Sequence, residues 1–482
     1  MKSNSISLVW AGALAAGAFA QQSTPCYEAS VGRWSGTSIL QPACVFLPMS
    51  AEDISAAFKV IVDGQCQFAT KSGGHNANKG ANSIDGGISI DLKHVNDILL
   101  SDDKSVVTVG TGNIWINVYN ALEGSGVAAA GALDATPGVG GLSIGGGLSI
   151  FSPTRGWIVD TVRNYRIVLP SGDIVNANAT SNPDLYKASK GGGSNFGIVT
   201  HVDLETGPFT QLWGGLILCS LEGPDADQPT MIEAAGQAVA DTAALSVEDS
   251  ASALNWAVGY FSNNGGRVLV AALANTEDVE NAPALEPWLS LPNPVQTQIG
   301  HMNLTEFTVM ASGFEPAGFR EVTGTITIKA DQTTLNEILT QGDAIYDALA
   351  VKDQVDWIIY NSLMPKAQQA HSATNGGNVL GLTDDDDTIF MWFNTRWTDP
   401  SLDDIMADVR DQWIALATSI AEKNGALVPY IYVNSAGPNQ DPLCSYGSEN
   451  VDLMRAVAQK YDEQGVMQKL NPGWFKLADA NC

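Results

Sequence analysis

The chain has 482 residues, 45% of them hydrophobic, which is enough for two sizeable cores because single domains usually stop growing below about 300 residues. It carries 24 Lys and Arg against 52 Asp and Glu, a formal net charge of −28. A surface this acidic repels phosphate backbones and anionic lipid headgroups, which argues against nucleic acid as a partner.

Residues 1–20 have the pattern of a signal peptide. Lys2 supplies the positive start, an apolar stretch covers 8–19, and Ala18-Phe19-Ala20 offers a cleavage site. No later segment has the roughly 18 uninterrupted apolar residues of a membrane helix. The sequence therefore predicts a secreted protein that begins near Gln21 and has no membrane partner.

The cysteines and two sequons fit export. The six cysteines are Cys26, Cys44, Cys66, Cys219, Cys444 and Cys482. They allow 15 pairings, among which the sequence does not choose, although a bond within the N-terminal trio is preferred. Asn178 and Asn303 are candidate glycosylation acceptors.

Between residues 35 and 207, short helices alternate with short strands. Ile54, Phe58 and Ile61 lie on one face of an expected helix. Strands are expected at 66–70, 87–92, 105–109, 162–169 and 197–204, with a helix at 114–122 and a glycine-rich loop at 138–147.

The pattern changes between residues 208 and 425. Strands at 216–221, 267–272, 322–329 and 355–362 are separated by long helices near 230–246, 333–350 and 400–422. This predicts an antiparallel sheet with helices on one face. The last part, 426–482, is expected to hold a strand at 429–434 and a helix at 450–462.

Three glycine-rich motifs indicate a ligand that the backbone approaches closely: KSGGH at 71–75, GVGGLSIGGG at 138–147 and GGGSNFGIVT at 191–200. Exposed backbone N–H groups in such motifs can hold a pyrophosphate. A metal site is not predicted, because no two of the five histidines are near in sequence and the carboxylate run 384–387 is typical of a solvated loop.

These motifs, with IDGGISIDL and NYRIVLPSGDIVNANA in the same order, resemble the berberine-bridge-enzyme-like FAD-linked oxidoreductases of the vanillyl-alcohol oxidase superfamily. The tail YIYVNSAGPNQDPLCSYG and QKLNPGWFKL is similar to fungal members. The resemblance covers 40–206 and 428–477. It implies an α+β fold with a two-part FAD-binding module of the p-cresol methylhydroxylase (PCMH) type at 35–207. An antiparallel-sheet substrate domain at 208–425 and a segment at 426–482 that returns to the FAD module would follow.

The resemblance also implies cofactor residues. In that family the motif histidine bonds the flavin at its 8α-methyl carbon, and His75 matches it; the alternative is a histidine that only caps a turn. Many relatives form a second bond from a cysteine where this chain has Asp134, so a monocovalent FAD is expected. The other expected FAD-binding residues are Lys71, Ser72, Gly73, Gly74, Gly138, Val139, Gly140, Gly141, Gly145, Gly146, Gly193, Asn195, Gly197, Ile198 and Val199.

Tyr430, Tyr432 and Asn434 alternate on the expected strand 429–434 and would share a face. The resemblance implies that Tyr432 acts as the base and that Asn434 lies beside the flavin. The alternative is an ordinary amphipathic strand whose tyrosines bond across the domain seam. Trp392, Asn394 and Arg396 alternate in the same way and are candidates for the substrate side.

The function predicted by resemblance is oxidation of a small organic molecule, such as a secondary metabolite, by hydride transfer to FAD with O2 as acceptor. One alternative is a carbohydrate or alcohol oxidase of the same fold. The other is a binding or cyclisation protein that retains flavin without net redox turnover. The sequence does not indicate the oligomeric state.

Overall fold

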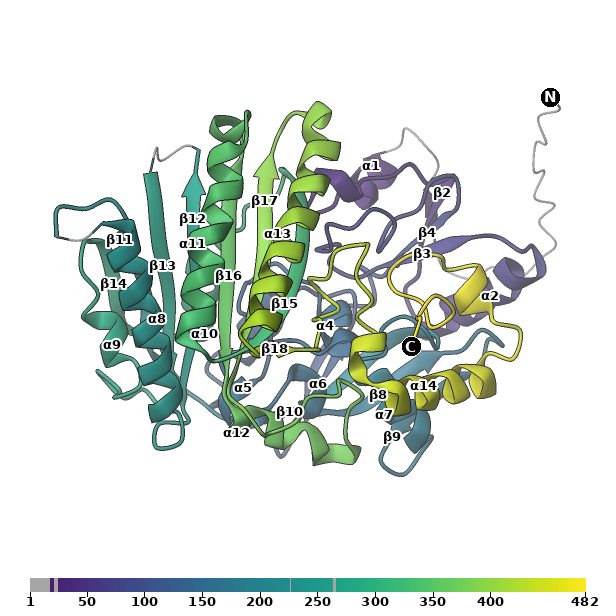
Figure 1. Cartoon of the computed structure of the whole chain (residues 1–482). Coiled ribbons are helices and arrows are strands. Elements are labelled where there is room, and N and C mark those ends of the chain that lie inside the picture. The colour runs from purple at the N-terminus through teal and green to yellow at the C-terminus, as the bar shows by residue number, and fades with distance from the viewer. Residues whose placement is uncertain (1–17, 21–24, 226, 263–265) are drawn as a thin grey trace.

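The computed structural model describes residues 18–20, 25–225, 227–262 and 266–482, so most of the signal peptide expected at 1–20 lies outside the described residues. The described chain forms three sheets. The largest sheet and its helices make up one part of the molecule, and the two smaller sheets make up the other (Figure 1). This is the α+β architecture that the sequence predicts. No helix among the described residues is long and apolar enough to cross a membrane.

The first small sheet has the strand order β1-β2-β4-β3. Its strands are β1 (Ala18–Ala20), β2 (Cys44–Leu47), β4 (Ile88–Asp91) and β3 (Phe68–Lys71). Because β2, β3 and β4 run parallel, a crossover must join β2 to β3, and α2 (Ala51–Asp63) provides it. The predicted apolar face of α2 is buried through Ile54, Phe58 and Ile61.

The second small sheet is built around a long central strand, β10 (Ile198–Pro208). The order is β5-β6-β10-β8-β9, and β7 also pairs with β10. Along β10 buried and half-buried residues alternate, as expected for a strand with one face in a core. The other strands are β5 (Ile98–Leu100), β6 (Val106–Gly110), β7 (Val127–Ala129), β8 (Val162–Val168) and β9 (Ile174–Asn178). The helices of this part are α1 (Pro25–Val31), α3 (Trp115–Leu122), α4 (Val139–Gly145), α5 (Ser152–Arg155), α6 (Ile158–Thr161) and α7 (Pro183–Ser189).

The large sheet has eight strands in the order β14-β11-β13-β12-β16-β17-β15-β18. Its pairings are all antiparallel. The strands are β11 (Leu212–Ser220), β12 (Ser252–Phe261), β13 (Gly266–Asn275), β14 (Pro294–Met302), β15 (Arg320–Lys329), β16 (Asp356–Met364), β17 (Thr388–Trp397) and β18 (Leu427–Val428).

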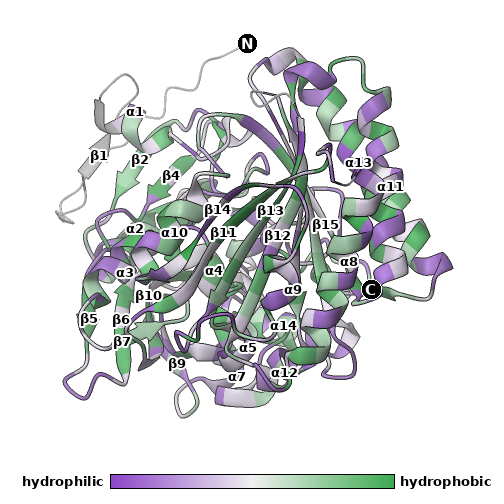
Figure 2. Ribbon diagram, turned by 90° about the vertical axis from the view of Figure 1, so that its left-hand side faces the viewer, coloured by the Kyte–Doolittle hydropathy of each residue, from purple (hydrophilic) through white to green (hydrophobic). Residues whose placement is uncertain are grey.

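Helices α8 (Gln228–Leu245), α11 (Gln332–Ala348) and α13 (Asp403–Lys423) cover one face of this sheet (Figure 1). Hydrophilic and hydrophobic residues alternate along α11 and α13, as amphipathic covering helices require (Figure 2). On β17, Phe393 faces them and stacks on Trp413 at 5.3 Å, whereas Phe390 and Trp392 point to the opposite face. That opposite face borders the smaller sheets. Shorter helices α9 (Glu286–Leu289), α10 (Leu304–Ser312) and α12 (Lys366–Gln369) complete this part.

Two stretches near the chain ends join distant regions. Helices α14 (Ser448–Tyr461) and α15 (Val466–Lys469) lie against the smaller sheets, where the amide of Phe68 donates to the carbonyl of Leu470 at 2.7 Å (Figure 1, yellow). Residues 33–38, here called the 33–38 segment, bond to the loop that precedes β15 and to the start of β15 itself. Trp34 Nε1 donates to the carbonyl of Glu315 at 3.0 Å, and the Glu321 amide donates to Ser35 Oγ at 2.9 Å.

Four details differ from the sequence-based predictions. The expected strand 429–434 is wrong: only Leu427–Val428 pairs, because the Ile431 amide donates to Ser445 Oγ and not to a strand. The expected loop 138–147 contains the helix α4. Strands β1, β2, β5, β7, β9, β12 and β14 were not predicted. A disulfide joins Cys444 and Cys482, whereas Cys44 and Cys66 carry free thiols, so the preferred N-terminal bond is absent between these two; the Cys26 side chain lies outside the described residues.

Candidate functional site

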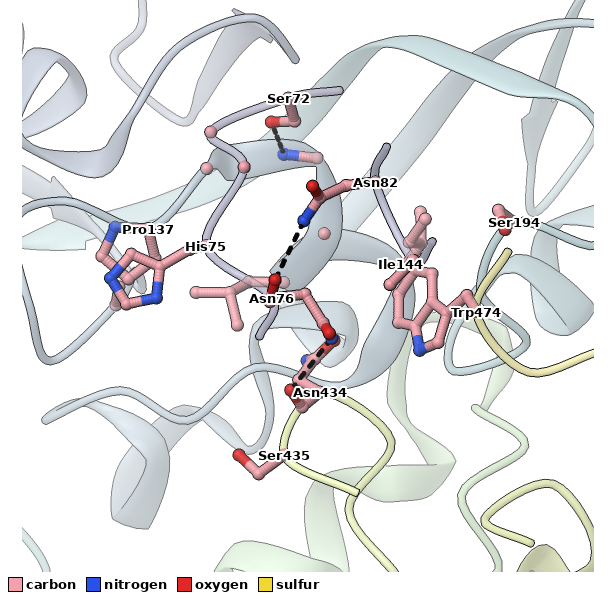
Figure 3. Close-up of a pocket in the computed structure, with 18 of the residues that line it drawn as sticks. Ser72, His75, Asn76, Asn82, Pro137, Ile144, Ser194, Asn434, Ser435 and Trp474 are labelled. Atoms are coloured by element: carbon pink, nitrogen blue, oxygen red, sulfur yellow. Dashed lines mark hydrogen bonds between the residues drawn. The ribbon is translucent and has the colours of Figure 1, made fainter. Parts of the chain in front are cut away.

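A cavity of about 280 Å³ lies where the glycine motifs, the large sheet and the C-terminal stretch meet. His75 lines it from the turn after β3, with Pro137 beside it, while Trp474 and Ile144 lie toward another side (Figure 3). The lining includes residues from every region in which the sequence predicts a site: Ser72, Gly73, Gly74, His75, Gly138, Gly140, Gly141, Gly197, Ile198, Val199, Tyr432 and Asn434.

The His75 ring is held on two sides. Trp34 stacks on it with the ring centroids 4.3 Å apart, and Nε2 lies 3.0 Å from Thr136 Oγ1. Burial lowers the pKa of His75, while Asp134 and the residue's own carbonyl act in the opposite direction. A half-buried, stacked imidazole with a fixed edge is a better candidate for a reactive group than a freely rotating turn residue.

The first two glycine motifs pack directly on each other. A Cβ on Gly73 would lie 2.4 Å from the Gly138 amide nitrogen, and one on Gly138 would lie 2.2 Å from that of Gly73. Glycine at both positions therefore lets the two loops pack backbone against backbone, where a side chain would clash. Gly141 is different, because a Cβ there would meet nothing within 4 Å, which leaves its backbone open toward the cavity.

Tyr432 reaches the cavity from the stretch after β18. Its hydroxyl oxygen accepts from the Gly147 amide at 3.1 Å and from Asn434 Nδ2 at 3.0 Å. Burial raises the pKa of Tyr432 to about 12, and these two donors act in the opposite direction. Both donors favour the phenolate, which is the form that a base requires.

A second cavity of about 120 Å³ continues from the first over the open face of the large sheet. The two cavities share Leu133, Asp134, Glu315, Ser362, Phe390 and Trp392. Most of the second wall is apolar, and Tyr360 and Trp392 stack there with the centroids 4.7 Å apart. Flat aromatic walls of this kind suit a flat, apolar molecule.

Two carboxyl groups lie where the cavities join. Burial raises the pKa of Glu315 to about 8, and the Asp134 carboxylate acts in the same direction. Glu315 is therefore mainly a neutral acid at neutral pH. Ligand atoms of His75, Asp134 and Glu315 lie within 4.8 Å of one another, a grouping that could hold a metal ion. The sequence did not show it, since the three are far apart in the chain, and the absence of a metal site stays a prediction.

Seven of the predicted site residues do not line the cavity: Lys71, Val139, Gly145, Gly146, Gly193, Asn195 and Tyr430. Lys71 instead pairs with Asp91 at 3.5 Å, and Asn195 holds the carbonyl of Phe475 at 3.1 Å. The Tyr430 hydroxyl is buried and finds no hydrogen-bond partner among the described residues. Of the candidates on β17, Trp392 lines both cavities, whereas Asn394 and Arg396 are buried with Glu321 and Asp356.

Sequence reasoning missed several residues that line the cavity. The chief ones are Trp34, Pro137, Glu315, Phe390 and Trp474. Glu315 and Trp34 stand outside any motif, and only tertiary packing brings them to His75. Phe390 had a usable signal, because it shares the β17 face with Trp392.

Comparisons with known proteins agree with this geometry. Residues 42–178 match the FAD binding domain family. The chain is 33% identical over 451 residues to the FAD-dependent monooxygenase tpcD of Cochliobolus heterostrophus, covering 91% of this chain and 85% of that protein. The chain belongs to the berberine-bridge-enzyme-like FAD-linked oxidoreductases. The resemblance in the motifs is thereby confirmed, and the protein is an FAD-linked oxidoreductase.

Solved structures of this family share the fold. The chain superposes on 6-hydroxy-D-nicotine oxidase of Arthrobacter nicotinovorans with a TM-score of 0.79 at 18% identity, covering 93% of this chain and 96% of that one. It also superposes on glucooligosaccharide oxidase of Acremonium strictum, described with 6-S-cysteinyl, 8α-N1-histidyl FAD, with a TM-score of 0.76 at 17% identity, covering 94% and 96%. The PCMH-type fold expected from the sequence is confirmed.

The cavity fits the FAD of this family in two respects. The open backbone at Gly141 provides a surface on which a large planar or phosphorylated group can lie closely. Two buried polar atoms of lining residues, Thr70 Oγ1 and Asp134 Oδ2, have no hydrogen-bond partner among the described residues. Buried polar atoms without partners in a cavity wall are typical of a ligand site.

Proposed function

We propose that the protein is a secreted oxidase that holds FAD through a single covalent bond to His75. Its substrate is a flat, largely apolar organic molecule that carries a hydroxyl or amine group, and O2 is the electron acceptor. The observation that carries this proposal is the aromatic-lined second cavity, which opens directly from the cavity of His75 and Tyr432.

Each part of the site has a task in this proposal. When bound, the flavin would accept a hydride from the substrate and pass the two electrons to oxygen. As the phenolate, which the Gly147 amide and Asn434 Nδ2 stabilise, Tyr432 takes the substrate proton at its oxygen and becomes neutral. Trp392 and Tyr360 hold the substrate plane, and the apolar wall excludes water.

The second candidate is a carbohydrate oxidase, which the solved relatives favour by name. A sugar needs many hydrogen-bond partners, and most residues that line the second cavity are apolar, although Asp134, Asn255, Glu315, Asn361 and Ser362 also line it. Asp134 also replaces the cysteine that the bicovalent relatives use. Both features favour the apolar substrate.

Three measurements test the proposal. In acid-precipitated protein, yellow colour should stay with the pellet, and peptide mapping should place the FAD mass on the His75 peptide. Flavin that washes into the supernatant would contradict the covalent bond. Under anaerobic conditions, phenolic and polyketide-like compounds should bleach the flavin faster than oligosaccharides. No bleaching by either class would instead support a flavin-retaining binding protein.

Oxygen use and export are tested separately. The relative tpcD is named a monooxygenase, whereas the solved relatives are named oxidases. Isotopically labelled O2 should appear only in hydrogen peroxide; label in the product would show monooxygenation. Expression with the native N-terminus should release protein that starts near Gln21 into the medium, and retention in the cell with residues 1–20 intact would contradict secretion.

A further inference from the structure

Thr136 connects His75 to Asp134. Its hydroxyl oxygen lies 3.0 Å from His75 Nε2 and 2.8 Å from Asp134 Oδ1. The same carboxylate oxygen accepts from the Thr136 amide at 2.6 Å. Asp134 is only 8% exposed, so the carboxylate has little freedom to turn away from this arrangement.

Asp134 is itself held from the other part of the molecule. The Ser312 hydroxyl, at the end of α10, lies 2.9 Å from Asp134 Oδ1 and 2.8 Å from the Thr308 carbonyl, so its one proton is shared between these two acceptors. The Ala135 amide donates to the Ser312 oxygen at 3.0 Å. The chain of contacts thus begins in the substrate domain and ends at the imidazole. The Thr136 amide and hydroxyl both donate to Asp134 Oδ1, with the Ser312 hydroxyl beside them, an arrangement that suits the ionised form.

With an ionised Asp134, the donors and acceptors in the hydrogen bonds among His75, Thr136 and Asp134 can be assigned in one way. A threonine hydroxyl has a single proton, and an ionised carboxylate only accepts. Thr136 therefore donates to Asp134, and its oxygen accepts from the Nε2–H of His75. In a neutral imidazole protonated at Nε2, the lone pair lies on Nδ1. No side chain among the described residues hydrogen-bonds to Nδ1, where the carbonyl of His75 itself is the neighbouring group, and a flip of the ring would break the Thr136 bond.

We propose that Asp134 and Thr136 are positioning residues that fix His75 as the Nε2–H tautomer and so present Nδ1 as the nucleophile for covalent attachment of the flavin. This inference rests on the proposed bond between His75 and FAD. Asp134 thus stands where the bicovalent relatives have the cysteine of their second flavin bond, and in this chain it orients His75, the residue proposed to form the single bond.

The attachment balances with O2 as the oxidant. One bond forms between Nδ1 and the 8α carbon, and one C–H bond of the 8α-methyl group breaks. The methyl carbon and the imidazole each lose one proton overall, since Nε2–H gives up its proton once Nδ1 is alkylated. The electron pair from the C–H bond passes through the flavin to O2, which leaves with both protons as hydrogen peroxide.

The test measures attachment and not turnover. Full-length protein from a riboflavin-starved host is mixed with FAD, and the colour that stays with acid-precipitated protein is followed over time. Thr136→Val, which has the same shape but no hydroxyl, should slow attachment by about tenfold or more, because residues that fix an imidazole tautomer have effects of this size or larger. Thr136→Ser, which keeps the hydroxyl, should attach FAD at close to the wild-type rate. Asp134→Asn should attach FAD slowly, because the asparagine amide can donate to the Thr136 hydroxyl and so reverse the direction of the hydrogen bonds.

Two further measurements separate positioning from folding. Reversible FAD binding, followed by quenching of flavin fluorescence before attachment, should be equal in wild type, Thr136→Val and Thr136→Ser. Imidazole nitrogen NMR of histidine-labelled apoprotein, with His75→Ala to assign the signal among five histidines, should show Nε2 protonated in wild type.

The outcomes distinguish the two proposals. Wild-type protein without covalent flavin would overturn the proposed bond and this inference together. Covalent wild-type protein with an equally fast Thr136→Val would overturn only the inference, and so would an Nδ1–H signal for His75. Slow attachment by Thr136→Val with rescue by Thr136→Ser supports both.

Discussion

Replacement of Tyr432 by phenylalanine tests the proposed base. The substitution removes the oxygen that accepts from the Gly147 amide and from Asn434 Nδ2. Each of these two buried donors, left without an acceptor, costs about 1–3 kcal/mol, so the free energy of unfolding should fall by roughly 2–6 kcal/mol, less if Asn434 turns to water. Loss of a positioned base should slow substrate-driven bleaching of the flavin by about 10²–10⁴-fold.

Urea denaturation measures the first effect, and anaerobic stopped-flow with a compound that bleaches the wild-type flavin measures the second. Tyr430→Phe is the matched control. Its hydroxyl is buried without a partner among the described residues and does not line the cavity, so its removal should leave the bleaching rate unchanged and should not lower the free energy of unfolding. Because the pKa of Tyr432 is raised to about 12, wild-type bleaching should rise with pH through the neutral and alkaline range, and the Tyr432→Phe rate should not. Wild-type bleaching rates in Tyr432→Phe would refute its role as base, as would an equal loss in Tyr430→Phe.

Three further predictions concern the frame of the site. Burial lowers the pKa of Lys476 to about 7, below its unfolded value, so the unfolded chain binds more protons between about pH 7 and 10 and stability should rise with pH in that window. Lys476→Met should remove that rise and add roughly 3–5 kcal/mol at pH 7; denaturant midpoints that change equally with pH in both proteins would contradict this. Cys482→Ser opens a bond across a separation of 38 residues and should lower the free energy of unfolding by about 3–4 kcal/mol and abolish the effect of reducing agent on stability, whereas Cys219→Ala, which keeps the bond, should still lose stability in reducing agent. Gly138→Ala should weaken FAD binding by about tenfold or more, because overpacking of this loop contact costs roughly 1–3 kcal/mol; Gly300→Ala, where a Cβ meets nothing, should bind FAD normally, and equal flavin content in both would refute the loop argument.

Sequence patterns predicted the elements that carry their own periodicity. The faces of α2 and α13 and the alternation along β17 are local properties, and the structure has helices and a strand at those places. The stretch 429–434 shows the limit of this reasoning. Its residues alternate as a strand would, but the backbone bonds to Ser445, and no local pattern reports which partner a backbone group will find.

The site was predictable where a motif carried it. His75, Gly138, Gly140 and Tyr432 all line the cavity. Lys71 and Asn195 stand in the same motifs yet bind other parts of the protein, because a motif records both ligand contacts and the contacts that shape the loop. Glu315 and Trp34 could not be found, since their relation to His75 exists only after the two parts of the chain have packed.

The 33–38 segment sets the time at which the site can be completed. Trp34 and Ser35 bond to partners 281 and 286 residues later in the chain. At a synthesis rate of about 5–20 residues per second, these partners emerge roughly 15–60 s after the segment itself. During that interval Trp34 lacks the bond that fixes its indole, and His75 lacks a held stacking partner. A nascent chain is therefore a poor acceptor for flavin, and under the proposed bond to His75 an attached flavin would mark a molecule whose folding is already complete.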